Sequence, residues 1–66
     1  MPPERFAMHL KLFRERRGLT QEALAKKAGI SRAYLARLEM GRHDPPLSRL
    51  RKLAKALGVR VGKLLE

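Results

Sequence analysis

The chain has 66 residues, no cysteine and two histidines, so we expect one small domain, residues 1–66, without disulfides or a structural metal. Sixteen lysines and arginines against six acidic residues give a net charge of +10, which favours a polyanionic partner, nucleic acid before membrane. No segment approaches the ~18 apolar residues of a membrane span, and the N-terminus lacks the apolar stretch of a signal peptide. These features predict a cytoplasmic protein.

Five short helices are predicted along the chain, from the periodicity of apolar residues and from the residues that start or stop helices. Pro2 and Pro3 suit the entrance of the first helix, whereas Asp44, Pro45 and Pro46 interrupt the chain before the fourth. A glycine follows each of the first four predicted helices, in a position where a left-handed backbone commonly ends a helix. We therefore expect an all-α fold. The predicted helices cover residues 4–17, 21–27, 32–40, 47–57 and 59–65.

The segment 19–39 is the most informative part of the sequence, because it contains two of these helices separated by a turn at Gly29. Thr20 and Ser31 are residue types that commonly cap helix N-termini, and each precedes one of the two helices. A short glycine turn lets the second helix cross the first and protrude. A helix placed in this way can enter the DNA major groove, which is about 12 Å wide. The apolar residues expected to fix the crossing are Leu24, Ile30, Leu35 and Leu38.

Short motifs over residues 6–65 form a pattern that is far more specific than any one of them. The motifs are the run Leu19 to Ala25, Gly29-Ile30-Ser31, Tyr34-Leu35, Leu38-Glu39, Gly41-Arg42, Pro45 and the run Leu53 to Val59. Together they resemble the Cro and phage-repressor type of helix-turn-helix, the XRE family. The resemblance implies a lambda-repressor-like fold of five helices, in which the second and third form the DNA-binding unit, and the function of a transcriptional regulator that binds double-stranded DNA.

Base-reading residues are expected on the helix predicted over residues 32–40. At about 100° per residue, Ala33, Ala36 and Arg37 fall on the stripe opposite the apolar face. The small alanines let the backbone approach the bases, and the guanidinium groups of Arg32 and Arg37 can each pair with guanine O6 and N7. The resemblance also places Arg32, Ala33 and Arg37 at base edges. Either arginine could instead contact phosphate or only solvent.

Four residues around this helix are expected to hold the DNA backbone: Thr20, Gln21, Tyr34 and Arg42. The resemblance assigns a phosphate to Gln21, at the helix start that Thr20 caps, and outward N–H groups there would assist it. Arg42 resembles a family segment that clasps the backbone beside the recognition helix. Tyr34 would lie against the sugar-phosphate backbone or cover the flank of the helix. Met40 departs from the family, which usually has a polar or basic residue at this position.

Arg14 and Glu39 are expected to form a buried ion pair between the first and third helices. Glu39 follows Leu35 by four residues and Arg14 follows Leu10 by four, so both side chains lean inward. A buried carboxylate without a partner costs several kcal/mol, and a forked guanidinium satisfies it. The family resemblance implies the same pair. The alternative is two separate charges at the surface.

A homodimer on a pseudo-palindromic operator is expected, because one domain of this size contacts about one half-site. Repressors of the resembled type place two recognition helices one DNA turn apart, about 34–36 Å. Apolar residues near the C-terminus exceed what one short helix can bury, so they are predicted to form the dimer contact. The alternative is that they only close the core of the monomer. These residues are Val59, Val61, Leu64 and Leu65.

Other functions also fit parts of the sequence. An antitoxin-type or scaffold module would bind a protein partner through its helices, and an RNA or ribosome binder would use charge alone. A small controller of restriction-modification genes would fit the size of the chain. The sequence has no pair of carboxylates, no nucleophile beside a base and no glycine-rich phosphate loop, so we expect neither an enzyme nor a cofactor or small-molecule substrate.

Overall fold

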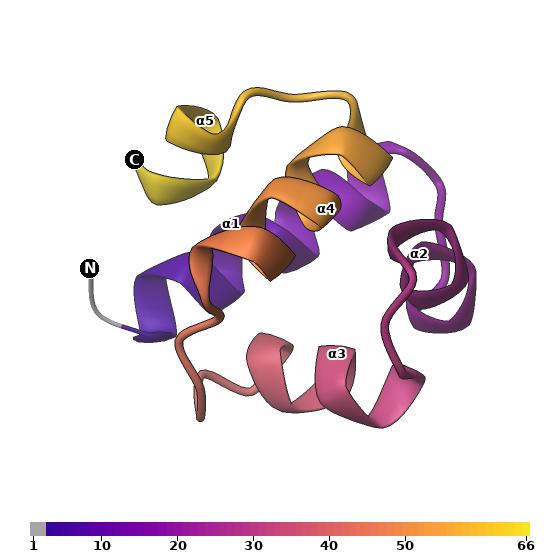
Figure 1. Ribbon diagram of the computed structural model, residues 1–66, viewed down its shortest axis with the longest axis horizontal. Helices are drawn as coiled ribbons and strands as arrows, with labels where there is room; N and C mark the ends of the chain where they lie inside the picture. The colour runs from indigo at the N-terminus through magenta and orange to yellow at the C-terminus, as the bar shows by residue number, and fades with distance from the viewer. Residues whose placement is uncertain (1–2) are drawn as a thin grey trace.

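The computed structural model describes residues 3–66, and within them the chain forms five helices and no strand (Figure 1). The predicted all-α fold is therefore confirmed. Pro3 is the first residue of the first helix, a position that suits proline, and Pro2 lies outside the described residues. The helices are α1 Pro3–Arg16, α2 Gln21–Ala28, α3 Arg32–Glu39, α4 Leu47–Leu57 and α5 Val61–Leu65.

The helix ends follow the capping residues of the sequence. The hydroxyl of Thr20 accepts the N–H of Ala23 at 3.0 Å and begins α2, and Gly29 ends α2 with a left-handed backbone, φ 72°. The hydroxyl of Ser31 accepts the N–H of Tyr34 at 3.0 Å and begins α3 in the same way. The turn from α2 to α3 therefore has only three residues.

The last helix begins two residues later than predicted, at Val61 instead of Val59. The reason is the end of α4, where Gly58 has a left-handed backbone and the N–H of Val59 donates to the carbonyl of Ala54 at 3.0 Å. This hydrogen bond makes Val59 part of the cap of α4. Arg60 is extended and leads into α5.

The core takes apolar side chains from every helix. α1 packs against α3 and α5, and α2 packs against α3 and α4. Figure 1 shows α3 along the lower edge of the molecule and α5 at the upper left. None of the helices in the described part of the chain has the length and apolar character needed to cross a bilayer. The largest fully buried side chains are Phe6, Leu10, Leu24, Leu35, Leu38, Leu53, Leu57 and Leu64.

Candidate nucleic-acid interface

α3 presents a basic face to solvent because its apolar face is used completely in the core. Leu35 and Leu38 have 0% exposed surface, and their burial fixes the rotation of the helix about its own axis. Arg32, Ala33 and Arg37 are exposed on the other side. Neither arginine forms an ion pair with another described residue, so both guanidinium groups are available to a partner.

The predicted ion pair of Arg14 and Glu39 is present beneath this helix. Arg14 Nε donates to Glu39 Oε2 at 2.7 Å and Arg14 Nη2 donates to Oε1 at 3.0 Å. The two side chains are only 11% and 4% exposed. The hydrogen bond to Glu39 raises the pKa of the Arg14 guanidinium above its ordinary value. A third donor, Arg14 Nη1, reaches the carbonyl of Leu19 at 2.8 Å, so the pair joins α1, α3 and the chain before α2.

Gln21 extends the ion pair to the start of α2, which the sequence did not reveal. Its Nε2 donates to Glu39 Oε1 at 3.2 Å. The amide keeps a second N–H and its carbonyl for another partner. This contact holds the first residue of α2 against the end of α3 and therefore fixes the mutual position of the two helices. The phosphate contact expected for Gln21 stays a prediction.

A shallow hollow of about 410 Å³ lies where α2 begins beside α3. Half-buried Ala36 and the exposed side chain of Met40 line it, together with Gln21 and the ion pair. Lys11 of α1 also lines this hollow, a position that sequence reasoning missed. Periodicity could not have placed it there, because the side of α1 that meets α3 depends on how the helices pack.

A second hollow, of about 400 Å³, lies between the beginning of α3 and side chains of α4. Tyr34 lines it, and the guanidinium of Arg49 lies over its ring, 4.6 Å from the ring centroid. Arg37 and Lys52 line the same hollow. Sequence reasoning missed Arg49 and Lys52, because nothing in the sequence of α4 shows that it lies beside α3. The contact expected between Tyr34 and the DNA backbone stays a prediction. The Arg49 guanidinium beside its ring carries a positive charge that suits phosphate.

The other two predicted phosphate contacts lie at exposed positions. Thr20 uses its hydroxyl oxygen as the acceptor that caps α2, which leaves the hydroxyl hydrogen free to donate. Arg42 is exposed in the loop after α3, and its backbone N–H donates to the carbonyl of Arg37 at 3.3 Å. Met40 is 61% exposed and supplies no charge. Both phosphate contacts stay predictions.

Only part of the predicted dimer contact is open to solvent. Leu64 has 0% exposed surface, so its assignment to a dimer contact is wrong: this side chain closes the core where α5 packs against α1. Val59 and Val61 are half-buried and pack against the same core. Leu65 is 43% exposed, and of the four residues it offers a partner the largest share of its surface.

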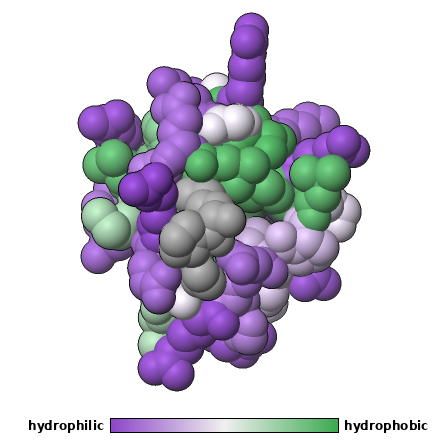
Figure 2. Space-filling view, turned by 90° about the vertical axis from the view of Figure 1, so that its left-hand side faces the viewer, coloured by the Kyte–Doolittle hydropathy of each residue, from purple (hydrophilic) through white to green (hydrophobic). Residues whose placement is uncertain are grey.

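α1 also carries exposed apolar side chains. Met8 and Leu12 are 71% and 42% exposed, and they lie off the stripe of α1 that enters the core. Figure 2 shows apolar surface gathered on the upper part of the side where the C-terminus lies, bordered by hydrophilic side chains. Neither Met8 nor Leu12 was among the residues predicted to form the dimer contact.

Two helices joined by a three-residue turn, the second exposed, basic and fixed by a buried ion pair, define a helix-turn-helix DNA-binding domain. Residues 10–64 match the helix-turn-helix family HTH_3, and the chain belongs to this family. The resemblance drawn from the motifs is therefore confirmed.

Curated relatives carry names of the same class. The chain is 46% identical over 56 residues to the immunity repressor protein of Bacillus phage phi105, with 85% of this chain and 39% of that protein covered. It is 46% identical over 52 residues to an HTH-type transcriptional regulator of Methanocaldococcus jannaschii, with 79% of each covered. The chain thus spans less than half of the phage repressor but most of the archaeal regulator.

Solved structures share the fold over nearly the whole chain. The restriction-modification controller protein C.AhdI from Aeromonas hydrophila is 34% identical, with a TM-score of 0.91 and 94% of each chain covered. The hypothetical transcription factor NHTF from Neisseria is 36% identical, with a TM-score of 0.94 over 100% of this chain and 76% of that one. The fold, the family and these relatives together support DNA-binding transcriptional regulation.

Proposed function

We propose that this protein is a homodimeric regulator that reads a pseudo-palindromic site in double-stranded DNA with α3. The observation that carries the proposal is the contrast between the two faces of this helix. Leu35 and Leu38 are completely buried, whereas Arg32 and Arg37 are exposed without an ion pair among the described residues. A helix that is held by its buried face and carries free guanidinium groups on its exposed face can donate hydrogen bonds to guanine edges in the major groove.

The surroundings of α3 support backbone contacts on both sides. Thr20 and Gln21 lie at the start of α2, where free N–H groups and the positive end of the helix dipole favour an anion. Tyr34 and Arg42 would hold phosphates nearer α3 and the loop that follows it. In this arrangement Ala33 and Ala36 let the backbone of α3 approach the bases. Nothing in this role requires catalysis, and its target would place the protein in the cytoplasm.

The dimer of this proposal forms through α5 and α1. Leu65 of α5 and Met8 and Leu12 of α1 supply exposed apolar side chains on two helices that pack together, and the half-buried Val61 begins α5. Two copies would present two copies of α3 to successive turns of the same groove, about 34–36 Å apart. The names of the relatives suggest a repressor or a controller of nearby genes, roles that a small dimer of this kind can fulfil by blocking or recruiting polymerase.

Selection of bound duplexes from a random library tests the proposal. Wild-type protein should enrich two inverted half-sites, and Arg32→Ala should lose the preference at a defined base position in each. Arg16→Ala, which removes an exposed arginine at the end of α1, is the matched control and should enrich the same sequence as wild type. Enrichment of no sequence at low ionic strength would contradict the proposal.

A further inference from the structure

A groove lined by lysines lies between the end of α2 and the outer side of α4. Lys26 and Lys27 line it from the last turn of α2, and Lys52 and Lys55 line it from α4. Small side chains form its floor, including Ala56, which is 6% exposed. The groove has a volume of about 430 Å³, and no carboxylate is among its lining residues.

The helix dipole explains only part of this charge. Lysines in the last turn stabilise a helix C-terminus, which accounts separately for Lys26, Lys27 and Lys55. It does not account for Lys52 in the middle of α4, or for the convergence of two helices on one groove. None of the four lysines forms an ion pair with another residue in the described part of the chain. Several uncompensated amino groups around one groove attract a ligand that carries several negative charges.

The groove is continuous with the surface proposed to bind DNA. Gly29 and Lys52 line both this groove and the hollow at the beginning of α3, which also contains Arg37 and Arg49. A basic surface therefore runs without interruption from α3 across α4 to α2. Figure 1 shows α2 and the beginning of α3 on the same side of the molecule. This continuity favours one extended polyanion over a separate acidic protein.

We propose that the lysine groove binds the phosphate backbone of DNA flanking the half-site read by α3, so that the duplex bends around the side of the domain. The inference rests on the proposed DNA-reading role of α3. The Cα trace extends 25 Å along its longest axis, the length of about seven base pairs at ~3.4 Å each. Because the groove lies beside α3, flanking DNA must curve toward the protein to reach it. Neutralised phosphates would offset the cost of this bend.

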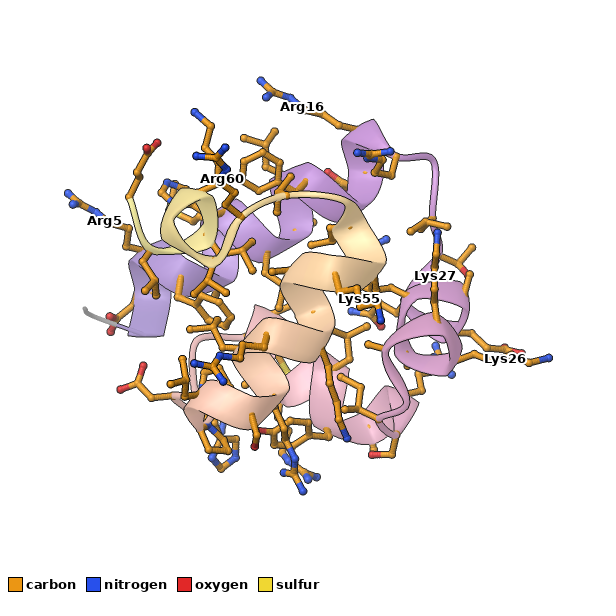
Figure 3. All side chains as sticks on the ribbon, turned by 45° about the horizontal axis from the view of Figure 1, so that its top comes forward. Arg5, Arg16, Lys26, Lys27, Lys55 and Arg60 are labelled. Carbon is orange, nitrogen blue, oxygen red and sulfur yellow. The ribbon has the colours of Figure 1, made fainter. Side chains whose placement is uncertain are left out.

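The test compares a short duplex, which ends at the edges of the selected site, with a duplex extended by about one helical turn, ~10 base pairs, on each side. Two triple variants remove the same charge from different surfaces. Figure 3 shows the lysines of the first variant on α2 and α4, and the arginines of the second on the side of α1 and α5. Lys52 is kept because it also lines the hollow beside α3. The variants are Lys26→Gln/Lys27→Gln/Lys55→Gln and, as the control, Arg5→Gln/Arg16→Gln/Arg60→Gln.

Wild type and the arginine variant should bind the long duplex about tenfold more tightly than the short one at about 50 mM salt. If this gain comes from about two added phosphate contacts, it should disappear when the salt is raised to about 200 mM. The lysine variant should bind both duplexes equally. A bent complex migrates more slowly in a gel when the site lies in the middle of the DNA fragment than when it lies at the end. This difference in migration should be smaller for the lysine variant than for wild type.

Two results would overturn the inference: no gain of wild type on the long duplex, or the same gain for both variants. In either case sequence preference on the short duplex would persist, and the proposed function would stand. Loss of that preference in wild type would instead refute the proposed function itself. The mass of each variant in solution, measured in parallel, shows whether the dimer is intact.

Discussion

Glu39→Ala tests the contact that joins three helices. The carboxylate accepts two hydrogen bonds from Arg14 of α1, at 2.7 and 3.0 Å, and one from Gln21 of α2, at 3.2 Å. The substitution removes the acceptor of all three and leaves an arginine side chain that is 11% exposed without its counter-charge. We expect a loss of stability that does not depend on any contact with DNA.

The size of the loss follows from burial. Removing one partner of a buried ion pair costs about 3–5 kcal/mol. Arg14 keeps the carbonyl of Leu19 at 2.8 Å, so we expect the lower end of this range, about 3 kcal/mol. A chain of this length has a free energy of unfolding of roughly 3–10 kcal/mol. The midpoint of thermal unfolding should fall by roughly 12–24 °C.

Thermal and urea unfolding followed by circular dichroism measure this effect. Glu15→Ala removes an exposed carboxylate from α1 and serves as the control, with an expected change below about 0.5 kcal/mol. The double variant Arg14→Met/Glu39→Leu should recover most of the loss, because it leaves no unpaired charge in the interior. If Glu39→Ala unfolds at the same midpoint as Glu15→Ala, the structural role assigned to the ion pair is refuted.

Three further predictions concern the site, the turn and the dimer. Arg32→Ala and Arg37→Ala should each weaken binding to the selected duplex by about 1–3 kcal/mol, measured by fluorescence anisotropy, without shifting the unfolding midpoint; a shift of the midpoint would assign the arginines to the fold. Gly29→Ala and Thr20→Ala should each lower the free energy of unfolding by about 1 kcal/mol. The first places an alanine at φ 72°, with nothing within 4 Å of the added methyl, and the second removes a helix cap. No loss of stability in either variant would contradict the turn geometry. Leu65→Glu should convert the proposed dimer to a folded monomer, measured by sedimentation, and a dimer that persists would place the interface on another surface.

Local chemistry made most of the fold predictable from the sequence. Thr20, Ser31 and Gly29 set the ends of α2 and α3 through bonds to their own neighbours, so their positions do not depend on distant parts of the chain. The pair of Arg14 and Glu39 was also accessible, because helical spacing turns both side chains inward and two opposite buried charges require each other.

Contacts that depend on how the helices pack were not accessible from the sequence. The guanidinium of Arg49 lies over Tyr34 only because α4 passes beside α3. Leu64 was predicted to contact a second subunit, but it is buried in the monomer because α5 packs against α1. Val59 was predicted as the first residue of the last helix because its role as a cap of α4 depends on one backbone bond. The lysine groove likewise forms only when α2 and α4 come together.

The central claim is that guanidinium groups on α3 touch base edges in the major groove. The most direct measurement replaces one guanine of the selected site at a time by 7-deazaguanine, which lacks the N7 acceptor, and compares wild type with Arg32→Ala and Arg37→Ala. At one guanine for each arginine, wild type should lose about tenfold in affinity, whereas the variant lacking that arginine should lose nothing more. Equal losses for wild type and variants at every guanine would contradict the claim.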